Sequence, residues 1–372
     1  MPPVLYHVDG FPPRAMDWER LLPFVGPATA AVARYQGMLE AIPNASVLLA
    51  PLTTQEAVLS SKIEGTQATM GEVLEFEAAG ATGNLSGAKS ADIQEVLNYR
   101  AALLQASAEM DSLPLSERVV KSAHRVLMDG VRGHAKAPGE YRKTPVWIGP
   151  DGSPMESARF VPIGAGDIPH AMSRWEKYLH SDAPDVLVQL AILHAEFEAI
   201  HPFLDGNGRL GRLLVPLFLV EKKVLARPNF YISGFLEQNR GEYYQRLLDV
   251  SANDDWTGWC VFFLTAIRRQ AEMNEARVRV ILEMYRTDKA WMAEATHSHH
   301  SIRALDWIYS RPIFNTADFI RGSGIPRASA TRILRVMKQG GKLREFRPTV
   351  GRRPAILGYP ELLNVAEGRE VF

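Results

Sequence analysis

The chain has 372 residues, of which 46% are hydrophobic and 23% are charged, and its 42 lysines and arginines are balanced by 42 aspartates and glutamates. This length allows two or three domains, and the composition is that of a folded globular protein, which excludes wholesale disorder and a mini-protein. The single cysteine, Cys260, has no partner for an internal disulfide, and the sequence shows neither a secretory leader pattern nor an apolar run long enough to span a membrane. We therefore expect a cytoplasmic protein with no membrane partner.

The first two thirds of the chain are patterned mainly as helices. Asp17 is placed to cap a first helix, and Pro27 is placed to open a second that ends near residue 43. Thr53 followed by Glu56 has the spacing of a capping box for a third helix, which Gly65 would end. Further helices are predicted over residues 91–110, 116–128, 167–179, 185–200, 207–221, 240–250 and 256–285.

The sequence contains few strand patterns, and the first begins at residue 144. Residues 144–149 and 159–163 flank a loop rich in proline and glycine, which predicts one β-hairpin. The polar residues 286–301 are expected to form a linker. Beyond them, three short helical patterns precede a two-stranded segment over residues 342–359 with Gly351 at its tip, the outline of a winged helix-turn-helix. The predicted fold class is mainly α, with one hairpin and a C-terminal winged helix-turn-helix.

The neutral overall charge conceals a basic region. Residues 311–353 contain eleven lysines and arginines against two acids, Asp318 and Glu345, a local charge of +9 that the rest of the chain balances. Such a charge attracts the phosphate backbone of DNA. Winged helices also bind proteins, and basic residues also solvate a surface, so these alternatives stay open from the sequence.

The densest cluster of unusual residues is the segment HPFLDGNGRLGR, residues 201–212, between two predicted helices. Gly206, Gly208 and Gly211 match the spacing of a dinucleotide-binding fingerprint, but a helix precedes them where that fold requires a strand, so we reject that interpretation. The physical argument for an anion remains. Glycines allow close approach of the backbone, and the free N–H groups at a helix N-terminus favour phosphate.

Four polar side chains of this segment indicate what the anion is. Arg209 and Arg212 are three residues apart, share a helix face and suit a polyphosphate. Asp205 supplies a hard oxygen ligand for Mg²⁺ bridging substrate phosphates, and His201 suits removal of a proton from a hydroxyl that attacks phosphorus. Each residue alone has an ordinary structural explanation; together, within twelve residues, they predict a phosphate-transfer site.

The same segment resembles the signature of the Fic family, with every fixed position present. The resemblance implies transfer of AMP from ATP to a Ser, Thr or Tyr hydroxyl of a target protein, with release of diphosphate. It implies that His201 is the general base and that Asp205 binds Mg²⁺. The implied anion cradle and phosphate clamps are Gly206, Asn207, Gly208, Arg209 and Arg212. A kinase-like relative has lysine at the position of Gly208, so the glycine favours nucleotidyl over phosphoryl transfer.

A second segment, SSKIEG at residues 60–65, is similar to the inhibitory helix motif of this family. The resemblance implies that Glu64 pairs with Arg212 and so hinders binding of the ATP γ-phosphate. Ser60 lies one turn before Glu64 and is placed to orient it, and Gly65 closes the motif. The ordinary alternative is a glutamate facing solvent at a helix end.

The predicted hairpin over residues 145–163 resembles the flap that aligns a target segment by strand addition in this family. Trp147, Ile148 and Phe160 would grip the target or nucleotide, or would only pack the hairpin down. Residues 239–244, with Tyr243 and Tyr244, resemble the stretch that walls the adenine pocket, as does Tyr231. The resemblance covers roughly residues 50–270.

The domain organisation follows from these assignments. We expect an N-terminal helical region over residues 1–100, with the inhibitory helix at about 53–65, a Fic core over 101–290, and a winged helix-turn-helix over 301–372. The leading hypothesis is an ATP- and Mg²⁺-dependent protein adenylyltransferase restrained by Glu64, with self-modification and a homodimer compatible with it. The alternatives are removal of AMP by the same site, another nucleotide donor, and a DNA-binding transcriptional regulator that senses nucleotide and binds DNA through residues 311–353.

Overall fold

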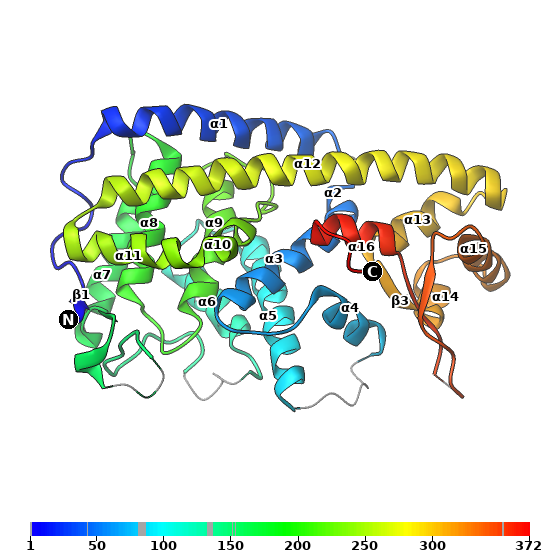
Figure 1. The fold of residues 1–372 in the computed structure, drawn as a ribbon, viewed down its shortest axis with the longest axis horizontal. Helices are drawn as coiled ribbons and strands as arrows, with labels where there is room; N and C mark the ends of the chain where they lie inside the picture. Colours follow the sequence, from blue (N-terminus) through cyan, green and yellow to red (C-terminus); the bar gives the residue numbers. More distant parts are fainter. Residues whose placement is uncertain are drawn as a thin grey trace. The chain divides into compact units, whose positions relative to one another are not determined.

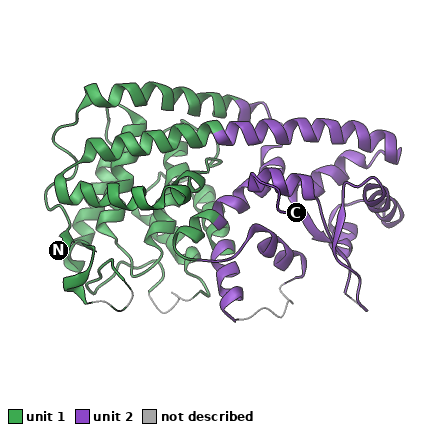
Figure 2. Ribbon diagram, viewed as in Figure 1, with its two compact units in different colours: residues 1–37, 59–65, 97–272 green, residues 38–58, 66–96, 273–372 purple. Residues whose placement is uncertain are grey.

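The computed structural model describes residues 2–42, 44–80, 87–131, 137–150, 152, 154–351 and 353–372. These residues are mainly helical, with two small sheets (Figure 1). They form two compact units, which Figure 2 distinguishes by colour. Unit 1 comprises residues 1–37, 59–65 and 97–272, and unit 2 comprises residues 38–58, 66–96 and 273–372. No helix in the described ranges is long and apolar enough to cross a membrane.

Four helices contribute residues to both units: α1 (Trp18–Glu40), α3 (Ala50–Ile63), α5 (Gly87–Glu109) and α12 (Trp256–Thr296). The other elements of unit 1 are β1 (Val4–Leu5), α6 (Glu117–Leu127), η1 (Met155–Ser157), β2 (Phe160–Val161), η2 (Ala165–Asp167), α7 (Ile168–His180), α8 (Val186–Ile200), α9 (Asn207–Glu221), α10 (Ser233–Gln238) and α11 (Arg240–Asn253). Helix α8 begins where expected, because the Asp185 side chain accepts hydrogen bonds from the backbone N–H groups of Leu187 and Val188. Almost all of α8 and α9 is buried, which makes this pair the core of unit 1.

The N-terminal part of the chain differs from the prediction. The two helices expected on either side of Pro27 are one helix, α1, with Pro23 and Pro27 inside it. A continuous stripe of buried residues that includes Leu21, Val32 and Tyr35 holds both halves, so packing outweighs the hydrogen bonds that the prolines remove. The predicted break is therefore wrong.

The predicted capping box at Thr53 is also wrong. Helix α3 already begins at Ala50, and the Thr53 hydroxyl donates a hydrogen bond to the carbonyl of Leu49. The capping box of this region is formed by Thr69 and Glu72, at the start of the unpredicted helix α4 (Met70–Ala78).

The predicted hairpin is reduced to a single antiparallel bridge between Ile148 and Phe160. Strand β2 instead pairs in parallel with β1, near the N-terminus, which the sequence analysis did not predict. The two residues after β1 are anchored to α8, because the Tyr6 hydroxyl donates to Glu196 Oε1 at 2.7 Å and His7 Nε2 contacts Glu196 Oε2 at 2.8 Å. One edge of β2 is therefore occupied by the chain's own N-terminal segment.

Unit 2 contains the remaining elements: α2 (Ala45–Leu48), α4, α13 (Ser301–Ser310), β3 (Ile313–Asn315), α14 (Thr316–Gly322), α15 (Arg327–Gln339), β4 (Arg344–Arg347), β5 (Ile356–Gly358) and α16 (Pro360–Glu367). The three strands form an antiparallel sheet in the order β3-β5-β4. The predicted linker is wrong, because α12 continues through residues 286–296.

The reason for this continuation is a buried carboxylate on α12. Asp288 is 1% exposed, accepts hydrogen bonds from the hydroxyls of Tyr309 and Tyr359, and forms an ion pair with Lys342 at 2.8 Å. The end of α12 is therefore part of the core of unit 2, although its sequence is polar. The polar sequence of residues 286–296 predicts a solvated segment, but Asp288 is buried among its hydrogen-bonding partners.

Candidate active site

The predicted anion loop lies between α8 and α9 in unit 1. His201 ends α8 in a left-handed conformation with φ +49°, and Gly206 precedes α9 with φ +77°. A Cβ at Gly206 would lie 2.7 Å from Met128 Sδ, so both the backbone angle and the close neighbour favour glycine there. The buried Arg142 ties the loop down: its Nε donates to the His201 carbonyl and its backbone N–H donates to the Pro202 carbonyl, both at 2.9 Å.

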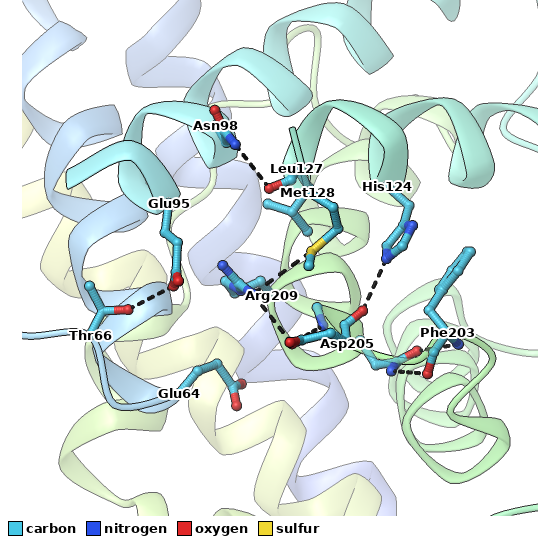
Figure 3. Close-up of polar contacts among 12 residues, drawn as sticks. Glu64, Thr66, Glu95, Asn98, His124, Leu127, Met128, Phe203, Asp205 and Arg209 are labelled. Atoms are coloured by element: carbon cyan, nitrogen blue, oxygen red, sulfur yellow. Dashed lines mark hydrogen bonds and ion pairs between the residues drawn. The ribbon is translucent and has the colours of Figure 1, made fainter. Parts of the chain in front are cut away.

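Asn207 and His124 fix the shape of the loop. The Asn207 side chain bonds both the N–H and the carbonyl of Phe203 at 2.9 Å, and the Phe203 ring stacks on His124 with centroids 3.7 Å apart. His124 Nδ1 accepts a hydrogen bond from the Gly139 N–H, so its Nε2 carries the proton and donates to the Asp205 carbonyl at 3.0 Å (Figure 3). Burial lowers the pKa of His124 to about 4, which keeps it neutral.

The Asp205 carboxylate lies at the mouth of this loop. Its Oδ1 accepts a hydrogen bond from the Gly206 N–H at 2.6 Å and lies 3.6 Å from Arg209 Nη2 (Figure 3). The side chain is 36% exposed, so a ligand can reach it. No cluster of three His, Cys, Asp or Glu side chains that could hold a metal ion occurs within the described ranges. A single reachable carboxylate suits Mg²⁺ that completes its coordination with substrate phosphates and water.

Arg212 is the most enclosed charge of the site. It is 0% exposed; its Nε donates to Ser60 Oγ at 2.9 Å, and its Nη2 donates to the Ser60 carbonyl at 2.9 Å and to Glu64 Oε1 at 2.7 Å. Burial opposes the charge of Arg212, but the Glu64 carboxylate outweighs it and raises the pKa of the guanidinium. Its Nη1 is buried without a hydrogen-bond partner among the residues described. The predicted contact between Glu64 and Arg212 is thus present in the structure, whereas Ser60, expected to orient Glu64, instead accepts hydrogen bonds from Arg212.

The Glu64 carboxylate covers the N-terminal end of α9. A Cβ at Gly208 would lie 2.2 Å from Glu64 Oε1 and 3.1 Å from Arg212 Nη1. The carboxylate therefore lies against the first turn of α9, where free N–H groups and the helix dipole favour an anion. The cradle, the buried arginine and its unpaired Nη1 fit a phosphate group. The carboxylate side chain is 33% exposed and can leave this position without opening the core.

His201 lies next to this loop with the properties of a base. Its Nδ1 is buried and has no hydrogen-bond partner among the described side chains and backbone. Burial first, and then the positive charge of Arg142, lower the pKa of His201 to about 4. The imidazole is therefore neutral at neutral pH, which is the protonation state that a general base requires.

The predicted aromatic residues are placed in different ways. Tyr243 is 1% exposed, and its hydroxyl bonds His194 Nε2 at 2.9 Å, whereas Tyr244 is 38% exposed beside Arg240. Tyr231 is buried. In the flap, Trp147 and Ile148 are exposed and Phe160 is buried. The roles of these residues toward nucleotide or target stay predictions. Gly65 follows Glu64 with φ +101°, a conformation that glycine adopts readily.

Three residues of the site were missed by sequence reasoning: Arg142, His124 and Glu198. Burial raises the pKa of Glu198 to about 8. A Cβ at Gly211 would lie 2.3 Å from the Glu198 carboxylate, so the third glycine of the loop gives this side chain its space. None of the three belongs to a short motif: Arg142 and His124 reach the loop from other segments, and Glu198 lies one turn before His201 on α8.

The described structure is that of a mainly helical protein with a glycine-containing loop at the N-terminus of a buried helix. Residues 22–108 match the sequence profile described as Fic/DOC family N-terminal, and residues 114–219 match the profile described as Fic/DOC family. Together the two matches cover more than half of the chain. The chain belongs to the Fic/DOC family.

Curated relatives and solved structures agree with this assignment. The chain is 29% identical over 195 residues to the protein adenylyltransferase Fic of Drosophila grimshawi, a match that spans 50% of this chain and 35% of the relative. It is 33% identical over 112 residues to the protein of the same name from Drosophila yakuba, which spans 29% of this chain and 20% of that relative. The matches thus span about a third or less of the length of these relatives. A Fic family protein from Desulfovibrio desulfuricans shares the fold over 94% of this chain and 98% of its own, with a TM-score of 0.59 and 22% identity.

Proposed function

We propose that this protein transfers AMP from ATP to a hydroxyl side chain of a target protein, and that Glu64 restrains the transfer. The observation that carries the proposal is the Glu64 carboxylate, bound at 2.7 Å to the buried Arg212 and seated on the first turn of α9. A carboxylate held there occupies the position that we propose for a phosphate group of ATP. The curated relatives, which are named protein adenylyltransferases, support the same reaction class.

The chemistry follows from the groups around the loop. A target hydroxyl attacks the α-phosphorus of ATP, the bond from that phosphorus to the bridging oxygen breaks, and diphosphate leaves. His201, neutral at neutral pH, accepts the hydroxyl proton. The first turn of α9 and Arg212 bind the phosphates that become the leaving group.

Mg²⁺ is expected as a cofactor held by Asp205 together with the substrate. Bound there, the ion neutralises phosphate charge and helps the diphosphate to leave. The protein contributes the orientation of the carboxylate: the backbone of Gly206 donates to it, and His124 holds the Asp205 carbonyl. Because His124 stays neutral, it places no positive charge of its own beside the residue expected to hold Mg²⁺.

Label transfer tests the reaction. The full chain is incubated with Mg²⁺ and ATP labelled at either the α- or the γ-phosphate, with the chain itself and a soluble protein extract as acceptors, in the Glu64→Gln background. We expect covalent label from the α-phosphate alone, lost in His201→Ala and kept in His170→Ala, a matched change at an exposed histidine on α7. Label from the γ-phosphate, or equal labelling without His201, would overturn the proposal.

A further inference from the structure

The region after α12 has the connectivity of a helix-turn-helix followed by a hairpin. Helices α14 and α15 are joined by the four residues 323–326, with Gly324 at φ +65°, which is the length and chemistry of a helix-turn-helix turn. Arg303 on α13 donates a hydrogen bond to the Gly324 carbonyl at 3.1 Å and fixes this turn. Phe319 on α14 packs edge-on against Trp307 of α13. These two contacts therefore hold α14 and the turn before α15 against α13.

Helix α15 has two unlike faces. Ala330, Ile333, Leu334 and Met337 are buried at the spacing of one helix face. The opposite, exposed face carries Ala328, Thr331, Arg332, Arg335 and Gln339. A face that only solvates a helix would be expected to include acidic residues, and α15 has none. Arginine, glutamine, threonine and alanine are side chains that contact base edges in the major groove of DNA.

The hairpin adds a second basic surface. Strands β4 and β5 pair in an antiparallel manner, and Gly351, with φ +58°, lies in the connection, where Val350 bridges Arg353. Val350 is 66% exposed, and Arg353 is also exposed. Arg352 lies outside the described residues. The hairpin thus places Arg353 near an exposed tip, in the same unit as α15.

Ion pairs neutralise only part of the basic charge, since Arg347 pairs with Glu75 and Lys342 with Asp288. Both acids of the segment are engaged, Asp318 by Arg321 and Glu345 by Lys338 at 2.6 Å. Arg332, Arg335 and Arg353 form no ion pair within the described ranges. Their side chains are exposed, so their charge is available to a polyanion.

We propose that residues 301–359 form a winged helix-turn-helix that binds duplex DNA, with α15 in the major groove and the β4–β5 hairpin beside it on the backbone. Helix α15 has 13 residues and is about 20 Å long, and an α-helix of about 10–12 Å diameter fits a major groove about 12 Å wide. The unpaired arginines contact phosphates and guanines, and the exposed Gln339 and Thr331 contact other base edges. This activity is separate from AMP transfer and does not depend on it.

Duplex binding is measured on the full chain by fluorescence anisotropy with a labelled random-sequence duplex of about two helical turns, at salt concentrations from about 50 to 200 mM. The test variant is Arg332→Glu/Arg335→Glu. The matched control is Arg118→Glu/Lys177→Glu, which changes the net charge equally at exposed positions of unit 1 that form no ion pair in the described structure. His201→Ala is measured in parallel and should bind DNA like the wild type.

We expect salt-dependent binding by the wild type and by the control pair. The test pair should bind at least about tenfold more weakly at 0.1 M salt, and the slope of log affinity against log salt should fall by about 1.8, the value for two phosphate contacts. Absence of duplex binding by the wild type, or equal weakening in both charge-reversed pairs, would overturn the proposal. The proposal would also be overturned if polyglutamate, at the same charge concentration, competed as strongly as unlabelled duplex, since the surface would then attract any polyanion.

Discussion

Replacing Glu64 with glutamine should raise AMP transfer, because it removes the charge that holds Arg212 while keeping the size of the side chain. The carboxylate accepts a hydrogen bond from a fully buried guanidinium at 2.7 Å, and its own side chain is 33% exposed. A charged hydrogen bond contributes about 1.5–3 kcal/mol net, and partial exposure favours the lower part of this range. At about 1.4 kcal/mol per tenfold, ATP should gain about 10- to 30-fold in apparent affinity.

The assay is the initial rate of transfer from α-labelled ATP at a concentration well below saturation, because the gain is in phosphate binding. Glu64→Gly should give a similar rise, and Ser60→Ala a smaller one, since it removes a hydrogen bond to Arg212 but leaves the competing charge. Glu275→Gln is the control: it breaks an ion pair of the same length, 2.7 Å, with an arginine that is 70% exposed. If Glu64→Gln transfers AMP at the wild-type rate while His201→Ala abolishes transfer, the restraint does not exist.

Three further predictions concern the loop and its supports. Gly206→Ala should destabilise the fold by about 1–3 kcal/mol and reduce transfer, because φ is +77° and the new Cβ would meet Met128 Sδ at 2.7 Å; urea unfolding and the label assay check this. Tyr6→Phe should cost about 1.5–3 kcal/mol in urea unfolding, because it removes a 2.7 Å hydrogen bond to the buried Glu196, whereas Tyr244→Phe should cost much less. Stability should fall as pH drops from about 6.5 toward 4: burial lowers the pKa of His124 and His201 to about 4 and of His194 to about 3, so the unfolded chain takes up protons that the native state refuses. The raised pKa of Glu198, about 8, acts in the opposite sense, because the native state keeps a proton there that the unfolded chain releases. The four groups together give the free energy of unfolding a slope of up to about 3 kcal/mol per pH unit, and a flat urea midpoint from pH 6.5 to 4.5 would contradict these burials.

The loop before α9 could be located closely from the sequence because its residues are contiguous. His201, Asp205, Gly206 and Arg212 lie within twelve residues, and α9 has the bounds expected from the sequence. The pairing of Glu64 with Arg212 spans 148 residues, and it was found only because a second motif resembled a family pattern. Residues without a motif, such as Arg142, were missed.

The remaining errors arose where tertiary contacts override local signals. The α1 prolines suggested a break, but a continuous buried stripe keeps one helix. The strand β1 has two residues and no pattern of its own, and its position depends on Glu196, about 190 residues away along the chain. A sequence pattern reports local preference, and these elements are set by partners that the pattern does not contain.

Helix α12 affects how the protein can be divided. Its first part buries Trp256 and Trp259 in unit 1, while Ile281, Asp288 and Met292 are buried farther along in unit 2. A truncation at residue 286 would remove the carboxylate that Tyr309, Tyr359 and Lys342 contact, and would leave these three side chains without their shared partner. The C-terminal region is therefore not a separable domain: a chain that begins within α12 would keep Asp288 but would lack residues 38–58 and 66–96, which belong to the same unit.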